Sequence, residues 1–362
     1  MNPFAIYRFP HSQQCTLIEQ TSGEPQRLSS LGGLSERSGF VVAPFQINDD
    51  TPILLIRPDR VSAVEVKEPS CNMPSIASEK DHHAEYAIDF ANFHSQLETG
   101  AFQKIVLARS ADISLTADAD PMQLFWRACK RYPRLFIALV SLPDGSYWLT
   151  ATPEILLEGS GNKWRTIALA GTMQLEGDQL QGEGEDVRWS TKNIQEQLYV
   201  ATYIAECLEQ FSLPFNEEGP RTVRAANLVH LRSDFTFDMT AETNIGLLLQ
   251  TLHPTPAVCG LPKRKAFDFI VQHEHAPRQY YSGFMGPLQM PSANCSTETH
   301  LYVSLRCMHV MGSHCTLYAG GGLLCDSISE LEWRETEAKM QTMRGVISSE
   351  VRGKKLEVRG ER

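Results

Sequence analysis

Strand patterns outnumber helical patterns in this chain, and short turns join many of them. Residues 134–142 and 145–159 read as two strands on either side of a turn at Gly145. Hairpins of this kind give antiparallel pairs, whereas a βαβ repeat would place a helix between successive strands. The sequence contains no internal repeat and neither of the common glycine-rich phosphate-binding motifs. These patterns predict an α+β fold with large, mainly antiparallel sheets.

A lysine stands in an unusual place on one of these predicted strands. Residues 101–115 form a strand pattern in which Lys104 shares a face with Phe102 and Val106. A lysine among apolar neighbours is either a charged gatekeeper on an edge strand or a desolvated base with a lowered pKa. The strand pattern alone favours the gatekeeper.

The glycine-rich stretch at residues 318–339 combines several groups that could bind a ligand. We expect residues 320–322 to turn the backbone sharply after a strand, and Ser329 with Glu332 to form a capping box that opens a helix. On that helix Glu332, Glu335 and Lys339 share one face and could hold a divalent cation and a carboxylate together. The alternative is a helix cap and an ordinary i,i+4 ion pair.

Other polar residues follow breaks in the strand patterns. Pro153 should bend or end its strand and aim Glu154 at whatever lies beside the bend. We expect a turn formed by the small residues at 170–172. His230 should lie on a later strand. A long helix over residues 183–211 should bury an apolar stripe and leave Glu196 off it. The triplet His273-Glu274-His275 resembles a metal site, but its spacing would splay the three ligands around a helix.

Composition restricts the partners and the compartment. The net charge is −10 and basic residues cluster only at the C-terminus, which argues against nucleic acid and anionic membranes as partners. Nine scattered cysteines without a C-x-x-C pair predict reduced thiols in a cytoplasmic protein. No run of 18 apolar residues and no signal-like start is present, so we expect neither a membrane span nor secretion.

Six motifs in order give the chain a family resemblance. They are KIVLAR, ATPEILL, LAGT, HPTPAVCGLP, SLRC and YAGGG…EWRETEAK. Together they resemble the chorismate-binding enzymes, and most closely the isochorismate synthases, over about residues 83–345. The resemblance implies one large α+β domain of two mainly antiparallel sheets packed with helices, with the active site between its halves. Residues 1–75 would be a variable N-terminal portion of that fold, residues 76–350 the catalytic domain, and residues 351–362 a frayed tail.

The same resemblance implies a role for each motif residue. Lys104 would be the general base and Glu154 the general acid. A neutral, buried Lys104 and a Glu154 with a raised pKa would suit that chemistry. Mg²⁺ would be held by Glu196 and Glu335, with Glu332 close by. Substrate contacts would come from a larger set, namely Gly171, Thr172, His230, Ala257, Arg306, Gly320 and Lys339.

The implied reaction is the reversible, Mg²⁺-dependent isomerisation of chorismate to isochorismate, for menaquinone or siderophore biosynthesis. A downstream enzyme would consume the isochorismate, and no glutamine amidotransferase subunit would be required. One alternative is a salicylate synthase, which also eliminates pyruvate, although lyase members tend to carry threonine where Ala257 stands. The other is a non-catalytic chorismate-binding protein. Ammonia-using relatives match less well because they usually lack a lysine at position 104. The chain departs from the family at Met173, Gln174 and Cys259.

Overall fold

A computed structural model describes residues 2–70, 73–80, 82–175, 187–225, 228–240, 243–291 and 296–348. Its strands form two ten-stranded sheets, and every strand pair in the described residues is antiparallel. The predicted α+β class is confirmed. The tail at residues 351–362 and the first residues of the helix predicted from residue 183 lie outside the described residues.

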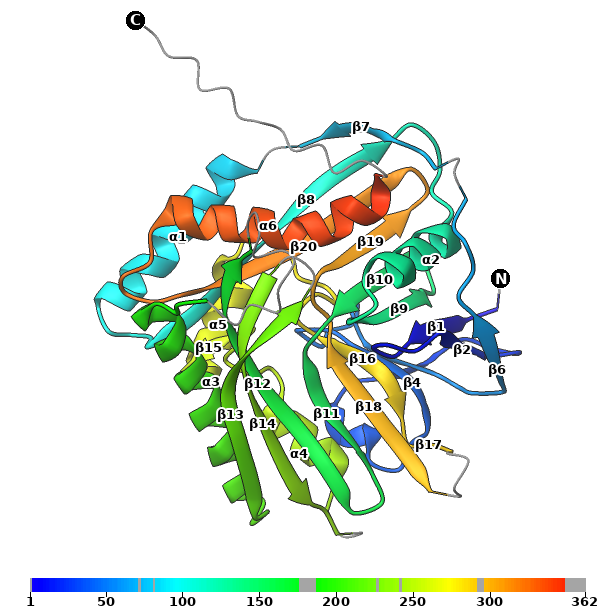
Figure 1. The fold of residues 1–362 in the computed structure, drawn as a ribbon, viewed down its shortest axis with the longest axis horizontal. Coiled ribbons are helices and arrows are strands. Elements are labelled where there is room, and N and C mark those ends of the chain that lie inside the picture. The colour runs from blue at the N-terminus through cyan, green and yellow to red at the C-terminus, as the bar shows by residue number, and fades with distance from the viewer. Residues whose placement is uncertain are drawn as a thin grey trace, which may run out of the picture.

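The first sheet, sheet A, runs across the upper half of Figure 1. Its strands in spatial order are β15 (Gly260–Leu261), β8 (Lys104–Leu115), β20 (His314–Leu323), β19 (Cys307–Met311), β10 (Tyr147–Thr152), β9 (Phe136–Ser141), β1 (Phe4–Arg8), β2 (Gln14–Glu19) and β6 (Arg60–Glu65), with β7 (Ile76–Glu79) beside β8.

The second sheet, sheet B, occupies the lower half of the same view (Figure 1). Its order is β13 (Phe215–Ala225), β14 (Leu228–Asp238), β12 (Lys163–Gln174), β11 (Ile155–Ser160), β18 (Thr297–Val303), β16 (Phe284–Leu288), β4 (Gly39–Ala43), β5 (Ile53–Ile56) and β3 (Gln26–Leu28), with β17 (Met290–Pro291) beside β18. The first 75 residues therefore supply strands to both sheets.

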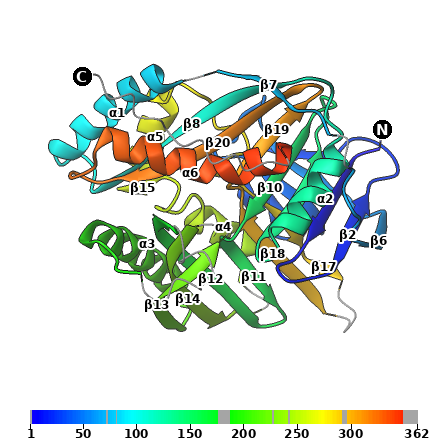
Figure 2. The ribbon, with the colours of Figure 1, turned by 45° about the horizontal axis from the view of Figure 1, so that its top comes forward.

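Helices cover the outer faces of the two sheets. In the described residues they are α1 (His83–Glu98), α2 (Pro121–Arg131), α3 (Thr191–Gln210), α4 (Ile245–Leu252), α5 (Lys263–His273) and α6 (Ser329–Ile347), with a short 3-10 turn at Leu31–Leu34. Figure 2 shows α6 lying along sheet A, where it packs on β20, while α3 packs on β12 of sheet B. A third apolar layer, including Phe136 and Tyr302 stacked 4.1 Å apart, fills the space between the sheets.

Two segments of the chain cross from one sheet to the other. The chain leaves sheet A after β10, passes Pro153 and Glu154, and enters sheet B as β11. It returns from β18 to β19 through residues 304–306, where Arg306 has a φ of 45°. The crossings lie side by side, because Val303 N donates to the carbonyl of Glu154 at 2.9 Å and Ala151 N to that of Arg306 at 3.1 Å. Both predicted polar residues thus lie where the sheets meet.

Glycines expected to form turns remain inside strands. Residues 320–322 continue β20, with Gly320 opposite Ala108 and Gly322 opposite Val106 on β8. Gly171 forms a bulge within β12 and has a φ of 67°, a left-handed conformation that glycine adopts without strain. The sharp turns predicted at both places were wrong, because long strands on either side continue the ladder past the glycines.

The helix α3 buries a different face from the one predicted. Of the apolar stripe, Ile204 and Leu208 are buried, but Ile194 and Leu198 are 53% and 60% exposed, and Glu196, which was expected to lie off the stripe, is buried. The apolar core lies under the C-terminal half of the helix, whereas its N-terminal half borders a polar cavity. No helix in the described part of the chain is long and apolar enough to span a membrane.

Candidate active site

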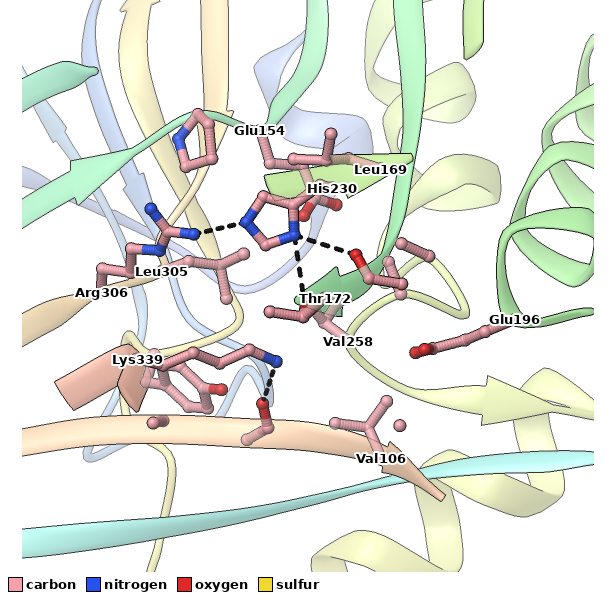
Figure 3. Close-up of a pocket in the computed structure, with 18 of the residues that line it drawn as sticks. Val106, Glu154, Leu169, Thr172, Glu196, His230, Val258, Leu305, Arg306 and Lys339 are labelled. Atoms are coloured by element: carbon pink, nitrogen blue, oxygen red, sulfur yellow. Dashed lines mark hydrogen bonds between the residues drawn. The ribbon is translucent and has the colours of Figure 1, made fainter. Parts of the chain in front are cut away.

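A cavity lies where the two crossings meet, with about 630 Å³ of empty space that includes its opening to solvent. Figure 3 shows Arg306, His230 and Lys339 on one side of it and Glu196 across from them. Its walls combine charged groups with apolar ones. They are Val106, Pro153, Glu154, Leu169, Ala170, Gly171, Thr172, Glu196, His230, Ala257, Val258, Tyr281, Leu305, Arg306, Tyr318, Ala319, Gly320, Gly322 and Lys339.

Arg306 and His230 form a buried polar pair on one wall. The guanidinium of Arg306 donates to Nε2 of His230 and, at 3.1 Å, to the carbonyl of Ala225. Nε2 therefore accepts, which places the ring proton on Nδ1, and Nδ1 donates to the carbonyl of Gly171 at 3.1 Å. Burial, with Arg306 beside the ring, holds the pKa of His230 well below its usual value. His230 is a neutral group that orients a cation toward the cavity.

Glu154 reaches the cavity from the first crossing and is 3% exposed. Burial raises its pKa to about 8, although Lys104, Lys339 and Arg306 all act in the opposite direction. The carboxyl group therefore carries a proton at neutral pH. A protonated carboxyl on a cavity wall can donate that proton to a leaving oxygen.

Lys339 projects from α6 across the glycine strand. Its ammonium donates to the carbonyl of Gly320 at 2.8 Å and to Glu335 Oε1 at 2.7 Å. The i,i+4 pair that we considered as an alternative does form. The lysine also lines the cavity, however, so its charge is available to an anionic ligand there.

Lys104 is completely buried, and its Nζ lies 2.9 Å from Glu196 Oε1. Burial excludes the gatekeeper interpretation, because a gatekeeper lysine needs solvent. Glu196 lines the cavity and Lys104 lies behind it. Burial disfavours the ionised form of Glu196, but Lys104 and Lys192 outweigh that effect and lower its pKa.

Glu332 does not cap its own helix. The residue before α6 is Ile328, and no side chain caps this end, so the predicted capping box is wrong. Glu332 instead points inward, 2% exposed, and pairs with Lys192 at the start of α3. Its second oxygen, Oε2, is buried without a hydrogen-bond partner. This long-range contact replaces the local capping bond.

The glycines of β20 provide the space for these side chains. A Cβ at Gly322 would lie 2.1 Å from Glu196 Oε1 and 2.8 Å from Lys104 Cε. One at Gly321 would lie 3.3 Å from the unpartnered oxygen of Glu332. The absence of side chains at these glycines lets the carboxylates of α3 and α6 and the side chain of Lys104 approach β20 closely.

The residues predicted to bind Mg²⁺ have suitable chemistry. Glu196, Glu332 and Glu335 offer hard oxygen donors beside Gly321 and Gly322, and a buried carboxylate oxygen without a partner invites a cation. Each carboxylate has a lysine partner instead, and no group of three acidic, histidine or cysteine side chains in the described residues already forms a metal cluster. The three carboxylates suit Mg²⁺, provided that the lysines leave their ion pairs with them.

Most of the predicted site residues converge on this cavity. Nine of the twelve line it: Glu154, Gly171, Thr172, Glu196, His230, Ala257, Arg306, Gly320 and Lys339. The other three, Lys104, Glu332 and Glu335, lie just behind the wall. Sequence reasoning missed Lys192, although it stands four residues before Glu196 on the same helix face. It also missed Tyr281 and Tyr318, which stack 5.7 Å apart on the apolar wall.

Comparison with known proteins places the chain in a family. The sequence model of the family described as chorismate binding enzyme matches residues 55–348. The chain belongs to the chorismate-binding enzyme family. The isochorismate synthase EntC of Escherichia coli (strain K12) is 30% identical over 254 residues, covering 69% of this chain and 63% of EntC. The salicylate biosynthesis isochorismate synthase of Pseudomonas aeruginosa is 32% identical over 259 residues, covering 70% of this chain and 53% of that protein.

A solved member of the family has the same fold. The structure of MenF, the menaquinone-specific isochorismate synthase from Escherichia coli, matches with a TM-score of 0.79 at 21% identity. The match covers 96% of this chain and 89% of that one. The aligned region spans less than two thirds of the length of EntC and of the Pseudomonas protein. The predicted family and its fold are thereby confirmed.

Proposed function

We propose that this chorismate-binding enzyme is an isochorismate synthase that isomerises chorismate to isochorismate and requires Mg²⁺. Water adds at one ring carbon of chorismate, and the hydroxyl group on another ring carbon leaves as water. The names of the matched relatives support this assignment. The observation that carries it is a cavity wall on which Glu154 holds a proton near pH 7, with the buried Lys104 next to Glu196 on the same cavity.

Charge complementarity supports the substrate class. Chorismate carries two carboxylates, and the cavity presents Arg306 and Lys339 as cations. An arginine fixed by His230 and the carbonyl of Ala225 is held ready for a carboxylate. The apolar wall formed by Tyr281 and Tyr318 suits the ring or the enolpyruvyl group of such a substrate.

The acid and base roles follow from the protonation states. Glu154 would donate its proton to the departing hydroxyl, because its pKa near 8 keeps the proton available at neutral pH. Lys104 would accept a proton from the attacking water, which requires it to leave its ion pair with Glu196 and lose its own proton first. Mg²⁺ held by Glu196, Glu332 and Glu335 would supply a counter-charge for a substrate carboxylate.

The test is to run the purified protein with Mg²⁺ from chorismate and, separately, from isochorismate. Substrate and product have the same charge and bond types, so both reactions should converge on one ratio without release of pyruvate. Chromatography resolves the two compounds. Stoichiometric pyruvate with salicylate would show a salicylate synthase. Binding of chorismate without turnover would show a non-catalytic binder.

A further inference from the structure

One edge of β8 lacks a strand partner over the residues that border the cavity. On its other edge β20 pairs with it along its length. On this edge β15 pairs only with Lys104 and Ile105, and β7 pairs only near Ile113–Leu115 in the described residues. The amide of Val106 is satisfied by the carbonyl of Cys259 at 2.7 Å. Between Val106 and the residues that β7 covers, no strand supplies hydrogen-bond partners to the backbone N–H and C=O groups on this edge of β8. Leaving such groups unpaired is costly inside a protein.

A buried ion pair takes the place of the missing strand. The amide of Ala108 donates to Glu274 Oε1 at 2.7 Å, and Arg278 Nη2 donates to the carbonyl of Val106 at 2.9 Å. Glu274 and Arg278 bind each other through two contacts of 2.6 and 2.7 Å, and both side chains are 3% exposed. The pair offers one acceptor and one donor in the order that a neighbouring strand would supply.

The same arginine also reaches the neighbouring segment of the cavity wall, residues 257–259. Arg278 Nη1 donates to the carbonyl of Val258 at 2.7 Å, and its guanidinium lies over the ring of Phe45 at 4.3 Å. Val106 and Val258 both line the cavity, one from β8 and one from the turn that carries Ala257. A single guanidinium therefore joins two separate wall segments through their backbone.

We propose that Glu274 and Arg278 are positioning residues for the reaction, which fix the spacing between β8 and the turn at residues 257–259. The activity part of this inference rests on the proposed function. Lys104 lies two residues before Val106, so any slip of this strand moves the proposed base relative to Glu154. Neither side chain lines the cavity, so both act through the backbone that they hold.

Arginine suits this position because its rigid planar fork can serve three acceptors at once. Lysine keeps the charge but has a single flexible ammonium, which cannot hold Glu274, Val106 and Val258 in the same geometry. Arg278→Lys is therefore the informative variant. The matched control is Arg8→Lys. Arg8 is also a buried arginine that donates to three backbone carbonyls, those of Tyr132, Pro133 and Leu135, but none of its contacts lines the cavity.

The kinetic test compares KM with kcat for chorismate. A merely structural role would reduce the fraction of folded enzyme, which lowers the apparent kcat and leaves KM unchanged. A positioning role should raise KM, because Val106 and Val258 line the cavity in which chorismate would bind, and should lower kcat/KM by about 10–100-fold in Arg278→Lys. Arg8→Lys should retain the wild-type KM. An unchanged KM in Arg278→Lys would overturn the inference.

Hydrogen exchange provides a readout that does not depend on activity. In the wild-type protein the amide of Ala108 should exchange as slowly as amides paired within the sheet, and Arg278→Lys should accelerate exchange in peptides covering residues 104–110. If Arg278→Lys does not fold, Glu274→Gln replaces it in both tests. Rapid exchange of the Ala108 amide in the wild type would refute the claim that the side chains of Glu274 and Arg278 replace the hydrogen bonds of a neighbouring strand. If the wild type fails to convert chorismate, the proposed function is wrong, and the exchange data alone decide this inference.

Discussion

The buried carboxyl of Glu154 should make the protein less stable as the pH rises, and Glu154→Gln should remove that effect. Burial raises the pKa of this group from its usual 4.5 to about 8 in the folded protein. Between these two values the folded protein keeps a proton that the unfolded chain releases. The folded state binds the extra proton, so its stability falls as the pH rises.

The size of the effect follows from the two pKa values. Each pH unit between 4.5 and 8 should lower the free energy of unfolding of the wild type by about 1.4 kcal/mol relative to the variant. The accumulated difference at pH 8 is about 5 kcal/mol. Any constant cost of burying the glutamine amide cancels, because only the change with pH is compared. Below pH 4.5 both states are protonated and the difference should be constant.

Denaturant unfolding at several pH values from 4.5 to 8.5 measures this difference directly. The control is Glu209→Gln, at an exposed position near the end of α3, whose curve should run parallel to that of the wild type. Parallel curves for Glu154→Gln as well would refute the raised pKa and, with it, the role of Glu154 as a proton donor. In the wild type, activity should also decline as the pH rises past about 8.

Three further predictions concern the residues around Lys104. Lys104→Ala should lower turnover by about 10²–10⁴-fold, whereas calorimetry should still detect chorismate binding, because a general base acts on water and not on the substrate carboxylates. Wild-type turnover in this variant would remove Lys104 from the mechanism. Glu335→Gln should shift the Mg²⁺ titration of activity to higher concentration, and a curve that overlays the wild type would reduce Glu335 to an ion-pair partner of its helix. Gly322→Ala should lower kcat by about 10²-fold, because its Cβ would displace Glu196, whereas Gly33→Ala should be neutral, because a Cβ there would make only ordinary contacts with Leu28. Equal activity of Gly322→Ala and the wild type would show that Glu196 can move without consequence.

Local sequence patterns predicted elements well where the signal was also local. Gly100 stands just past the end of α1 (His83–Glu98), where glycine commonly ends a helix, and Pro121 begins α2 behind an aspartate that caps it. Such boundaries depend on side chains a few residues apart, which a sequence reader sees directly. The two crossings between sheets depend on distant partners. Residues on both sides of Pro153 read as strand, and nothing nearby indicates that they belong to different sheets.

Long-range contacts also decided which predictions about the site were incomplete. The capping-box pattern of Ser329 and Glu332 is a local signal. In the structure, however, the carboxylate of Glu332 binds Lys192, which is 140 residues away along the chain, and does not cap the helix. Similarly, Glu196 appeared to lie off the buried stripe of its helix because its partner Lys104 comes from a distant strand. The family motifs identified these glutamates, whereas periodicity alone would have placed both in solvent.

The balance of charge around the cavity supports the proposed use of a divalent cation in binding a dicarboxylate. Four cations, Lys104, Lys192, Lys339 and Arg306, surround three carboxylates, and Glu154 is uncharged near pH 7. One net positive charge then faces a ligand with two negative charges, in a protein whose net charge is −10. A cation bound by the three glutamates would raise the local charge to three and free lysines from their ion pairs. Of these, Lys339 already lines the cavity, where it could bind a carboxylate of the substrate.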